Sequence, residues 1–338
     1  MSPRLIAIPL LLLPFGPRTA SAQEVLLTRV VDVGAGLCTV TIAPGDSRSR
    51  IMVYDAGHWQ GHACRNAVRE TVLGDTIDVL VLSHSDADHL GDADDILKEK
   101  VVKLIVRTGF RRDDTGNWRN ANNSIGDEAK QVASVINLGS LALPFGQALP
   151  LGDATITFIA GWHRWTLTSG LSDSERRNAV SIVGRLDYDG RSILFGGDTV
   201  GRRIGDPDTA CRDAEAEMVN GSVSLTADVL IAPHHGADNA SSGCFIDAVD
   251  PQFVIFSAGH DHGHPREAAA QRYLDHGVPL SSIFRTDRGD DEEDEPDEWK
   301  HLSVPGCRDG RADDDVDVFI IQGGGLLVGY RDPSASGC

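Results

Sequence analysis

Hydrophobic positions along the chain form short apolar runs and amphipathic stretches that follow one another in turn. Apolar runs bounded by glycine, proline or polar clusters predict strands, and apolar residues spaced by three or four predict helices. We expect strands at residues 25–33, 37–42, 50–55, 77–82, 101–106, 154–160, 179–186, 192–195, 227–232 and 253–257, and a closing hairpin at 316–321 and 326–330. We expect helices at residues 62–73, 93–99, 124–137, 213–220 and 266–276. This alternation predicts an α/β fold.

Two polar stretches interrupt the pattern. Residues 108–123 show no apolar period and predict a loop, followed by a helix that Ser124 caps. Residues 287–298 are mostly acidic and contain Pro296, which predicts a solvated loop, since they lack the spacing of a calcium-binding loop. No proline- or serine-rich linker divides the chain, so residues 23–338 are expected to form a single domain with loop insertions.

The N-terminal segment, residues 1–22, has the layout of a cleavable signal peptide. A short basic start precedes an apolar run at residues 5–15, and Ala20 and Ala22 form a cleavage pattern before Gln23. The run is too short to span a membrane, and no later segment is long and apolar enough. The mature protein is therefore expected to be secreted or periplasmic, without a membrane span.

Composition adds two constraints. The formal net charge is −19, and an acidic surface does not attract polyanions at long range, so a nucleic-acid substrate would have to be held by metal ions or a few arginines. The six cysteines include no C-x-x-C pair, which favours disulfides over a zinc knuckle in an exported protein. Six cysteines allow 15 pairings, and a bridge from the last residue, Cys338, would fix the C-terminus.

The strongest local signal lies directly after the strand expected at residues 77–82. Within six residues the chain places four side chains that can bind a metal: His84, Asp86, Asp88 and His89. A divalent cation needs several nitrogen and oxygen donors that converge on one point, and a tight turn at a strand end delivers them. Two imidazoles and two carboxylates buried together would otherwise repel or remain unpaired.

Two further strand ends carry residues of the same kind. Asp198 follows two glycines after the strand at 192–195, and His234 and His235 follow the strand at 227–232. Three strand ends with imidazoles and carboxylates predict a metal site whose donors, none of them cysteine, suit zinc, manganese or iron.

The order of these residues resembles the metallo-β-lactamase superfamily, and more closely the metallo-β-lactamase-like domain of the ComEC-type DNA-uptake family. The resemblance covers roughly residues 25–287 and rests on motifs in one order. These motifs are Asp55-Ala-Gly, His84-x-Asp86-x-Asp88-His89, Asn178-Ala-Val-Ser181, Asp198, Pro233-His234-His235-Gly236 with Ser241 and Ser242 behind, Gly263-His264-Pro265 and Phe284-Arg-Thr-Asp287. As in that domain, Asp86 stands where the usual H-x-H-x-D-H pattern has its second histidine.

The resemblance implies an αββα sandwich with one or two divalent ions, zinc or manganese, at one edge of its sheets. It implies that His84, Asp86 and His234 hold a first ion, and that Asp88, His89 and Asp198 hold or share a second, with Asp198 bridging. His234 is preferred over His235 because it comes first after the strand, although either remains a candidate ligand. Asp55 is expected to be structural.

One position departs from the binuclear pattern. Most binuclear members have another histidine before the bridging aspartate, and Asn178 stands near that position here. Asparagine is a weak neutral ligand, so the first ion is expected to bind loosely or not at all. His163 is an alternative donor, although a lone histidine between two tryptophans is more often a packing or surface residue.

The expected reaction is hydrolysis by a metal-activated water, with Asp88 orienting the water and His264 contacting a phosphoryl oxygen or protonating the leaving group. The resemblance favours a phosphodiester substrate, a small molecule or a nucleic acid. Phosphates would then contact arginines of the first long loop: Arg107, Arg111, Arg112 and Arg119. His264 is otherwise a capping or packing residue.

Two alternatives remain open. In the first alternative, the chain hydrolyses a β-lactam, a lactone or another ester or amide. Export suits this alternative, but Asp86 and Asn178 disfavour it. In the second, it is a non-catalytic metal-binding module, which the near-complete set of ligands opposes. The sequence predicts no protein partner.

Overall fold

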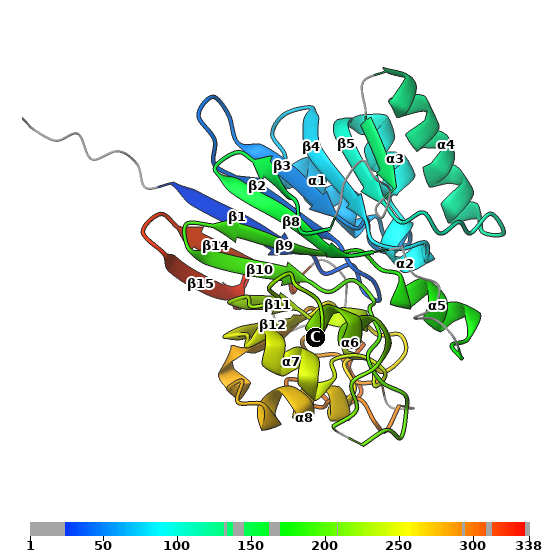
Figure 1. The fold of residues 1–338 in the computed structure, drawn as a ribbon, viewed down its shortest axis with the longest axis vertical. Helices are drawn as coiled ribbons and strands as arrows, with labels where there is room; N and C mark the ends of the chain where they lie inside the picture. Colours follow the sequence, from blue (N-terminus) through cyan, green and yellow to red (C-terminus); the bar gives the residue numbers. More distant parts are fainter. Residues whose placement is uncertain are drawn as a thin grey trace, which may run out of the picture.

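The computed structural model describes residues 24–131, 134–137, 145–161, 170–207, 209–292, 295–308 and 313–334. In these residues two β-sheets pack face to face, and helices cover the outer face of each (Figure 1). The chain thus has the αββα sandwich that the sequence predicted. The expected signal peptide, His163 and Cys338 lie outside the described residues.

The first sheet has eight strands in the order β15-β14-β1-β2-β3-β4-β5-β6. Its first half is antiparallel, and from β3 onward the strands run parallel. The strands are β1 (Val25–Val30), β2 (Thr39–Ala43), β3 (Arg50–Tyr54), β4 (Thr76–Leu82), β5 (Val101–Arg107), β6 (Ser134–Asn137), β14 (Val316–Ile321) and β15 (Gly325–Tyr330). The expected closing hairpin is confirmed as β14 and β15, and it adds to the edge of β1.

The second sheet has seven strands in the order β13-β12-β11-β10-β9-β8-β7. Strands β10 to β13 run parallel, and β7 to β10 are antiparallel. The strands are β7 (Ala148–Leu151), β8 (Ala154–Ala160), β9 (Val183–Tyr188), β10 (Arg191–Phe195), β11 (Val229–Ile231), β12 (Phe253–Phe256) and β13 (Ile283–Arg285). The parallel strands are the ones that end in candidate metal ligands.

The helices divide between the two outer faces. The apolar core outside the first sheet includes residues of α1 (Ala63–Thr71), α2 (Ala87–Leu90), α3 (Ala93–Glu99) and α4 (Gly116–Gln131). The core outside the second sheet includes residues of α6 (Asp213–Val219), α7 (Gly243–Val249) and α8 (Glu267–Asp275). The short helix α5 (Asp173–Ala179) precedes β9, and the 3-10 turns η2 (Pro233–Gly236) and η3 (Leu280–Ser282) follow β11 and α8.

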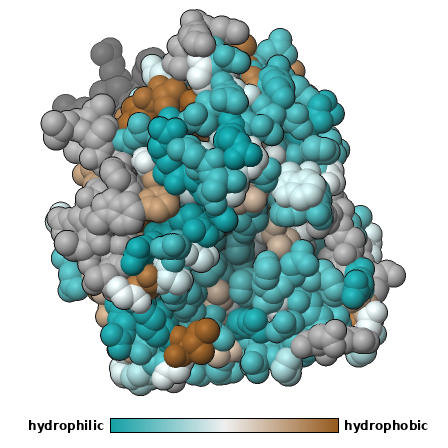
Figure 2. Space-filling view, turned by 90° about the vertical axis from the view of Figure 1, so that its right-hand side faces the viewer, coloured by the Kyte–Doolittle hydropathy of each residue, from teal (hydrophilic) through white to brown (hydrophobic). Residues whose placement is uncertain are grey.

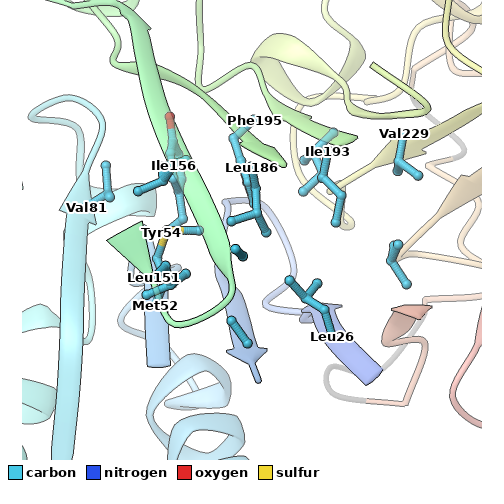
Figure 3. Packing of buried hydrophobic residues seen from close by; sticks show 14 of the residues in the cluster. Leu26, Met52, Tyr54, Val81, Leu151, Ile156, Leu186, Ile193, Phe195 and Val229 are labelled. Atoms are coloured by element: carbon cyan, nitrogen blue, oxygen red, sulfur yellow. The ribbon is translucent and has the colours of Figure 1, made fainter. Parts of the chain in front are cut away.

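The central core lies between the two sheets (Figure 3). Met52, Tyr54 and Val81 of the first sheet meet Ile156, Leu186, Ile193 and Phe195 of the second, and all of them are buried. The Tyr54 and Phe195 rings stack with centroids 4.8 Å apart, and the buried Tyr54 hydroxyl donates to the Ile182 carbonyl. This polar bond across an apolar layer fixes the end of β3 against β9, close to the strand ends that carry the candidate ligands.

The prediction for residues 108–137 was wrong in its boundaries. Helix α4 begins at Gly116 within the expected loop, and residues 134–137 form strand β6 where the end of a helix was expected. Trp118, Ala121 and Ile125 are buried at helical spacing and pack in the core outside the first sheet. Three apolar residues among many polar ones were too few to reveal this period in the sequence. Residues 179–182 likewise precede β9 and are not part of it.

The acidic segment 287–298 is not the solvated loop that its composition predicted. Asp287, Asp290 and Glu298 are buried, and Asp287 and Glu298 contact the fully buried Arg285 at the end of β13. The Arg285 guanidinium donates to both Asp287 oxygens at 2.7 Å and to Glu298 Oε1 at 3.0 Å. Because one arginine neutralises part of the segment, its carboxylates fold inward.

Disulfides join Cys38 to Cys64 and Cys211 to Cys244, and Cys307 is also disulfide-bonded. The described part of the chain contains no helix long and apolar enough to cross a membrane. The disulfides are compatible with an exported protein.

Replacing Arg285 with methionine is expected to lower the free energy of unfolding by about 3–5 kcal/mol, since the substitution leaves buried carboxylates without their cation. Chemical denaturation followed by tryptophan fluorescence measures the change. Lys98→Met is the control, because Lys98 forms an exposed pair with Asp94 on α3 and should leave the denaturation midpoint unchanged. Equal midpoints for the two variants would show that the buried ion cluster contributes nothing.

Candidate metal centre

The carboxyl ends of three strands meet at one edge of the sandwich. β10 and β11 are parallel neighbours, so the loops that follow them emerge side by side. The loop after β4 joins them from the other sheet, because the Ile182 N–H donates to the Ser83 carbonyl at 2.9 Å. Gly196 permits the close approach, since an added Cβ there would lie 2.9 Å from the Pro233 nitrogen. Residues distant in sequence thus converge at one point.

Asp88, His89, Asp198 and His235 form the tightest group, with one ligand-type atom from each lying within 4.8 Å of the others. Asp198 Oδ1 lies 3.1 Å from His89 Nε2 and 3.4 Å from His235 Nε2. Asp88 Oδ2 lies 3.5 Å from His235 Nε2 and 3.7 Å from His89 Nε2. Two imidazole nitrogens and two carboxylate oxygens therefore surround one small volume, as a divalent cation requires. We call these four residues the four-ligand cluster.

Asp55 orients His89 from behind. It follows β3 with φ 59°, and its buried carboxylate accepts from the Ser83 N–H, the Ser83 hydroxyl and His89 Nδ1, each at 2.7 Å. Since Nδ1 donates to Asp55, the Nε2 lone pair of His89 points into the cluster. The expected structural role of Asp55 is therefore that of a carboxylate that fixes the tautomer and direction of His89.

His235 is oriented in the same way, by a backbone group. Its Nδ1 donates to the Ser257 carbonyl at 2.7 Å, so Nε2 is the ring nitrogen that faces Asp88 and Asp198. His234 and His235 both have positive φ, 51° and 56°. Two consecutive left-handed residues are a strained arrangement for side chains with a Cβ, and strain of this kind is concentrated at functional sites.

A second, looser group faces the other oxygen of Asp198. His84 Nε2 lies 3.6 Å and His234 Nε2 4.0 Å from Asp198 Oδ2. The Asn178 amide lies 2.9 Å from His234 Nε2, and His234 Nδ1 donates to Asn239 Oδ1 at 2.8 Å. Within the described residues, His84 Nε2 and Asn178 Oδ1 are buried without a hydrogen-bond partner. Asp198 thus stands between two sets of donors, as a bridging carboxylate would.

The electrostatics of the cluster favour a cation at its centre. Burial alone would raise the pKa of Asp198, but His89, His235 and His84 outweigh burial and hold the pKa well below its usual range. Burial would lower the pKa of His235, but Asp198 and Asp88 raise it to about 9, and the pKa of His89 is also raised by its carboxylate neighbours. Burial lowers the pKa of His84 and of His234. Without a metal, protons on His89 and His235 supply the positive charge that the two carboxylates require.

Asp86 makes its ion pairs with two arginines and not with either group, although its negative charge acts on the pKa of His84. Its Oδ1 accepts from Arg112 Nη1 at 2.6 Å and from Arg177 Nε at 2.5 Å. Arg177 belongs to α5, a helix that the sequence prediction missed although its capping box was visible, with Ser172 and Glu175 bonded reciprocally. The structure therefore places Asp86 in an ion triplet with two arginines.

A cavity of about 550 Å³ opens above the cluster. Its walls include Asp86, Asp88, Asn178, Asp198, His234, His235, His264, Asp261, Arg266 and Glu295. The His264 ring lies nearly parallel to His235 with centroids 6.1 Å apart, and 5.9 Å from the His234 ring. Burial, together with His235 and His234, holds the pKa of His264 well below its usual range. His264 thus faces the metal site from the cavity wall.

The structure brings together nearly all of the residues that the sequence singled out. Asp88, His89, Asp198 and His235 form one group, and His84, His234 and Asn178 lie against the other side of Asp198. The sequence did not reveal three residues that hold candidate ligands. Arg177 contacts Asp86 from 91 residues away, Ser257 contacts His235 from 22 residues away, and Asn239 contacts His234 from five residues away. Arg112 reaches Asp86, while Arg107 donates to Asn122 and Asn137.

Comparisons with known proteins agree with this geometry. Residues 34–153 match the model of the Metallo-beta-lactamase superfamily. ComE operon protein 3 of Bacillus subtilis is 25% identical over 277 residues, which cover 77% of this chain and 31% of that protein. Competence protein ComA of Neisseria gonorrhoeae is 33% identical over 123 residues, which cover 35% of this chain and 16% of that protein. The chain thus spans about a third of the length of the first relative and about a sixth of the second.

A solved structure described as the metallo-beta-lactamase fold protein YhfI from Bacillus subtilis is also similar. It aligns with a TM-score of 0.46 and 14% identity, and the alignment covers 78% of this chain and 96% of that chain.

Replacing Asp55 with asparagine is expected to weaken zinc or manganese binding by about 10–100-fold, because an amide cannot accept all three hydrogen bonds that orient Ser83 and His89. Isothermal titration calorimetry on the metal-free protein measures the affinity. Asp78→Asn is the matched control, since Asp78 accepts from Arg48 and Ile51 near the opposite end of β4. If both variants bind the metal as the wild type does, Asp55 does not tune the site.

Proposed function

We propose that this chain is a metallo-hydrolase similar to the metallo-β-lactamase superfamily, and that it hydrolyses phosphodiester bonds with a divalent cation held by the four-ligand cluster. The observation that carries the proposal is the cluster itself: the buried His89, Asp198 and His235 and the partly exposed Asp88 direct ligand-type atoms at one volume. The proposal includes export, because the disulfides in the chain suit an oxidising compartment.

The donor set fits a metal ion and narrows its identity. It contains imidazole nitrogens and carboxylate oxygens, which suit zinc or manganese. A second ion is proposed to bind more weakly between His84, His234 and Asp198 Oδ2, where His84 Nε2 is buried without a hydrogen-bond partner. Asn178 is the only neutral amide near that position among the described cavity walls, and it contributes a weaker donor than an imidazole would.

The reaction divides between the ion and the protein. A divalent cation at the cluster lowers the pKa of a bound water and polarises a phosphoryl oxygen. Asp88, which is partly exposed toward the cavity while Asp198 is buried, orients the water for attack. His264 donates a hydrogen bond to the phosphoryl group from the part of the cavity wall beside His234 and His235. The cavity of about 550 Å³ is large enough for a dinucleotide-sized segment.

A phosphodiester is favoured as the substrate by similarity and by the departures from the binuclear pattern. The chain resembles the ComEC-type DNA-uptake domain, and one of its curated relatives is named competence protein ComA. The net charge of −19 disfavours long-range attraction of a duplex, so we propose that a short single-stranded segment enters the cavity.

Asp88→Ala is expected to lower kcat/KM for bis(p-nitrophenyl) phosphate and for single-stranded DNA by at least about 10²-fold, since it removes a ligand and the residue that orients the water. Chelation of the metal should have the same effect, and added manganese or zinc should restore activity. Asp94→Ala on the surface of α3 is the control and should act as the wild type does. A chromogenic cephalosporin is assayed in parallel, and cleavage of the cephalosporin alone would replace the phosphodiesterase proposal with a β-lactamase.

His264→Ala is expected to lower kcat for the same phosphodiesters by about 10–10²-fold and to leave the number of bound metal ions unchanged, because His264 contacts substrate in the proposal and no metal. Metal content measured on the same samples separates the two roles. A variant with full activity would make His264 a packing residue, and a variant that loses the metal would make it a ligand.

A further inference from the structure

Asp86 occupies a position where the metal-binding pattern expects a ligand, yet its contacts are those of an anion held by arginines. Arg112 Nη1 and Arg177 Nε both donate to the same oxygen, Asp86 Oδ1, at 2.6 and 2.5 Å. These arginines come from separate segments: Arg112 lies in the loop before α4 and Arg177 on α5. We call Asp86, Arg112 and Arg177 the arginine triplet.

These contacts make Asp86 a poor metal ligand. A cation bound at Asp86 Oδ1 would lie beside two guanidinium groups that carry permanent charge. Asp86 also forms its ion pairs with Arg112 and Arg177, whereas His84 and His234 lie 3.6 and 4.0 Å from Asp198. The carboxylate is therefore already neutralised by the protein, and it anchors the arginines in place.

The triplet brings positive charge to an acidic cavity. Two guanidiniums and one carboxylate sum to one net positive charge at neutral pH. The other charged residues of the cavity wall, away from the histidines, are Asp88, Asp198, Asp261 and Glu295, and Arg266 is paired with Glu295 at 3.2 Å. A metal at the four-ligand cluster offsets Asp88 and Asp198. The arginine triplet is therefore the main protein-borne attraction for a second negative group of the substrate.

The triplet lies at the margin of the cavity: Asp86 lines the cavity, and Arg112 and Arg177 contact Asp86 from just outside the lining residues. Asp86 lines the cavity together with Ser174 and Asn178, the neighbours of Arg177 on α5. The Arg112 and Arg177 side chains are 25% and 15% exposed, so they are held but not sealed from solvent. Each guanidinium has five N–H donors in a fixed fork, and Asp86 accepts one of them from each. Figure 2 shows that the face near α2, α4 and α5 is mostly hydrophilic.

We propose that Asp86 positions Arg112 and Arg177 as an anion-binding pair that holds a phosphate next to the one being hydrolysed, and that Asp86 does not ligate metal. This inference rests on the proposed phosphodiesterase function and names its substrate more closely. The substrate is a chain with more than one phosphate, such as an oligonucleotide, and a single isolated phosphodiester binds without help from the pair.

The first experiment measures metal binding to Asp86→Asn by calorimetry and by metal content per chain. The expected affinity for manganese or zinc lies within about threefold of the wild type, and the number of ions is unchanged. A loss of one ion per chain, or a weakening of tenfold or more, would overturn the proposal by making Asp86 a ligand.

The second experiment compares an octathymidylate with bis(p-nitrophenyl) phosphate. Arg112→Ala and Arg177→Ala are each expected to raise KM for the octathymidylate about tenfold with little change in kcat, and to leave kcat/KM for bis(p-nitrophenyl) phosphate within about twofold. The slope of log KM against log salt should fall by about 0.7 for each lost phosphate contact. The conservative changes Arg112→Lys and Arg177→Lys should recover part of the KM, because charge is kept.

Matched controls are available beside each arginine. Arg111 contacts Asp113 in the same loop, and Arg176 contacts Asp173 on the same helix, so Arg111→Ala and Arg176→Ala remove the same charge without touching Asp86. Equal KM values for the test and control variants would show that the triplet has only a structural role, and would overturn the proposal.

If the wild type cleaves neither substrate, the proposed phosphodiesterase function fails, and calorimetry with pyrophosphate decides the arginine pair separately. Binding that weakens about tenfold in Arg112→Ala and Arg177→Ala, but not in the controls, would uphold the anion site. Unchanged binding would remove it.

Discussion

The close approach of two ionised carboxylates, one buried and one partly exposed, beside several imidazoles is the constraint on which the rest of this structure depends. Asp88 and Asp198 cannot stay charged so close together unless positive charge lies between them. The protein supplies that charge through His89 and His235 when no metal is bound, and a divalent cation supplies it better. The hydrogen bonds around the cluster, from Asp55, Ser257 and Asn239, serve to hold the imidazoles at the orientation that this balance requires.

The sandwich can hold these side chains close together, because each of its two sheets contributes rigid strand ends. Tyr54 at the end of β3 crosses the central core to bond Ile182, and Asp55, the next residue, fixes Ser83 and His89. Packing of the two sheets and orientation of the ligands are thereby coupled within two consecutive residues. The site is positioned on strand ends and short turns instead of long loops, which limits the spread of ligand positions.

The sequence revealed the local parts of this design and missed the parts made by distant contacts. The apolar runs of β4, β10 and β11, each followed by imidazoles or carboxylates, carried the fold class and most of the candidate ligands, since these signals lie within a few residues. The partners of Asp86 lie 26 and 91 residues away, and no local pattern announces them. The composition of residues 287–298 also led to a wrong prediction. A run of acidic residues normally indicates a solvated loop, but the buried Arg285 pairs with Asp287 and Glu298 and draws them inward.

The pairing of β1 with β14 has a consequence for the order of folding. Val25 pairs with Ile321, so the middle of the first sheet is joined across nearly the whole chain. Loop-closure entropy opposes such a contact until the intervening elements have condensed, which makes the topology slow to complete. During synthesis from the N-terminus, the chain can form β2 to β5 and the candidate metal-binding turn after β4. Strand β14 is synthesised much later and only then pairs with β1. The turn that holds His84 to His89 therefore exists first on an incomplete sheet, and the edge of β1 stays open to other strands until the last hairpin closes it.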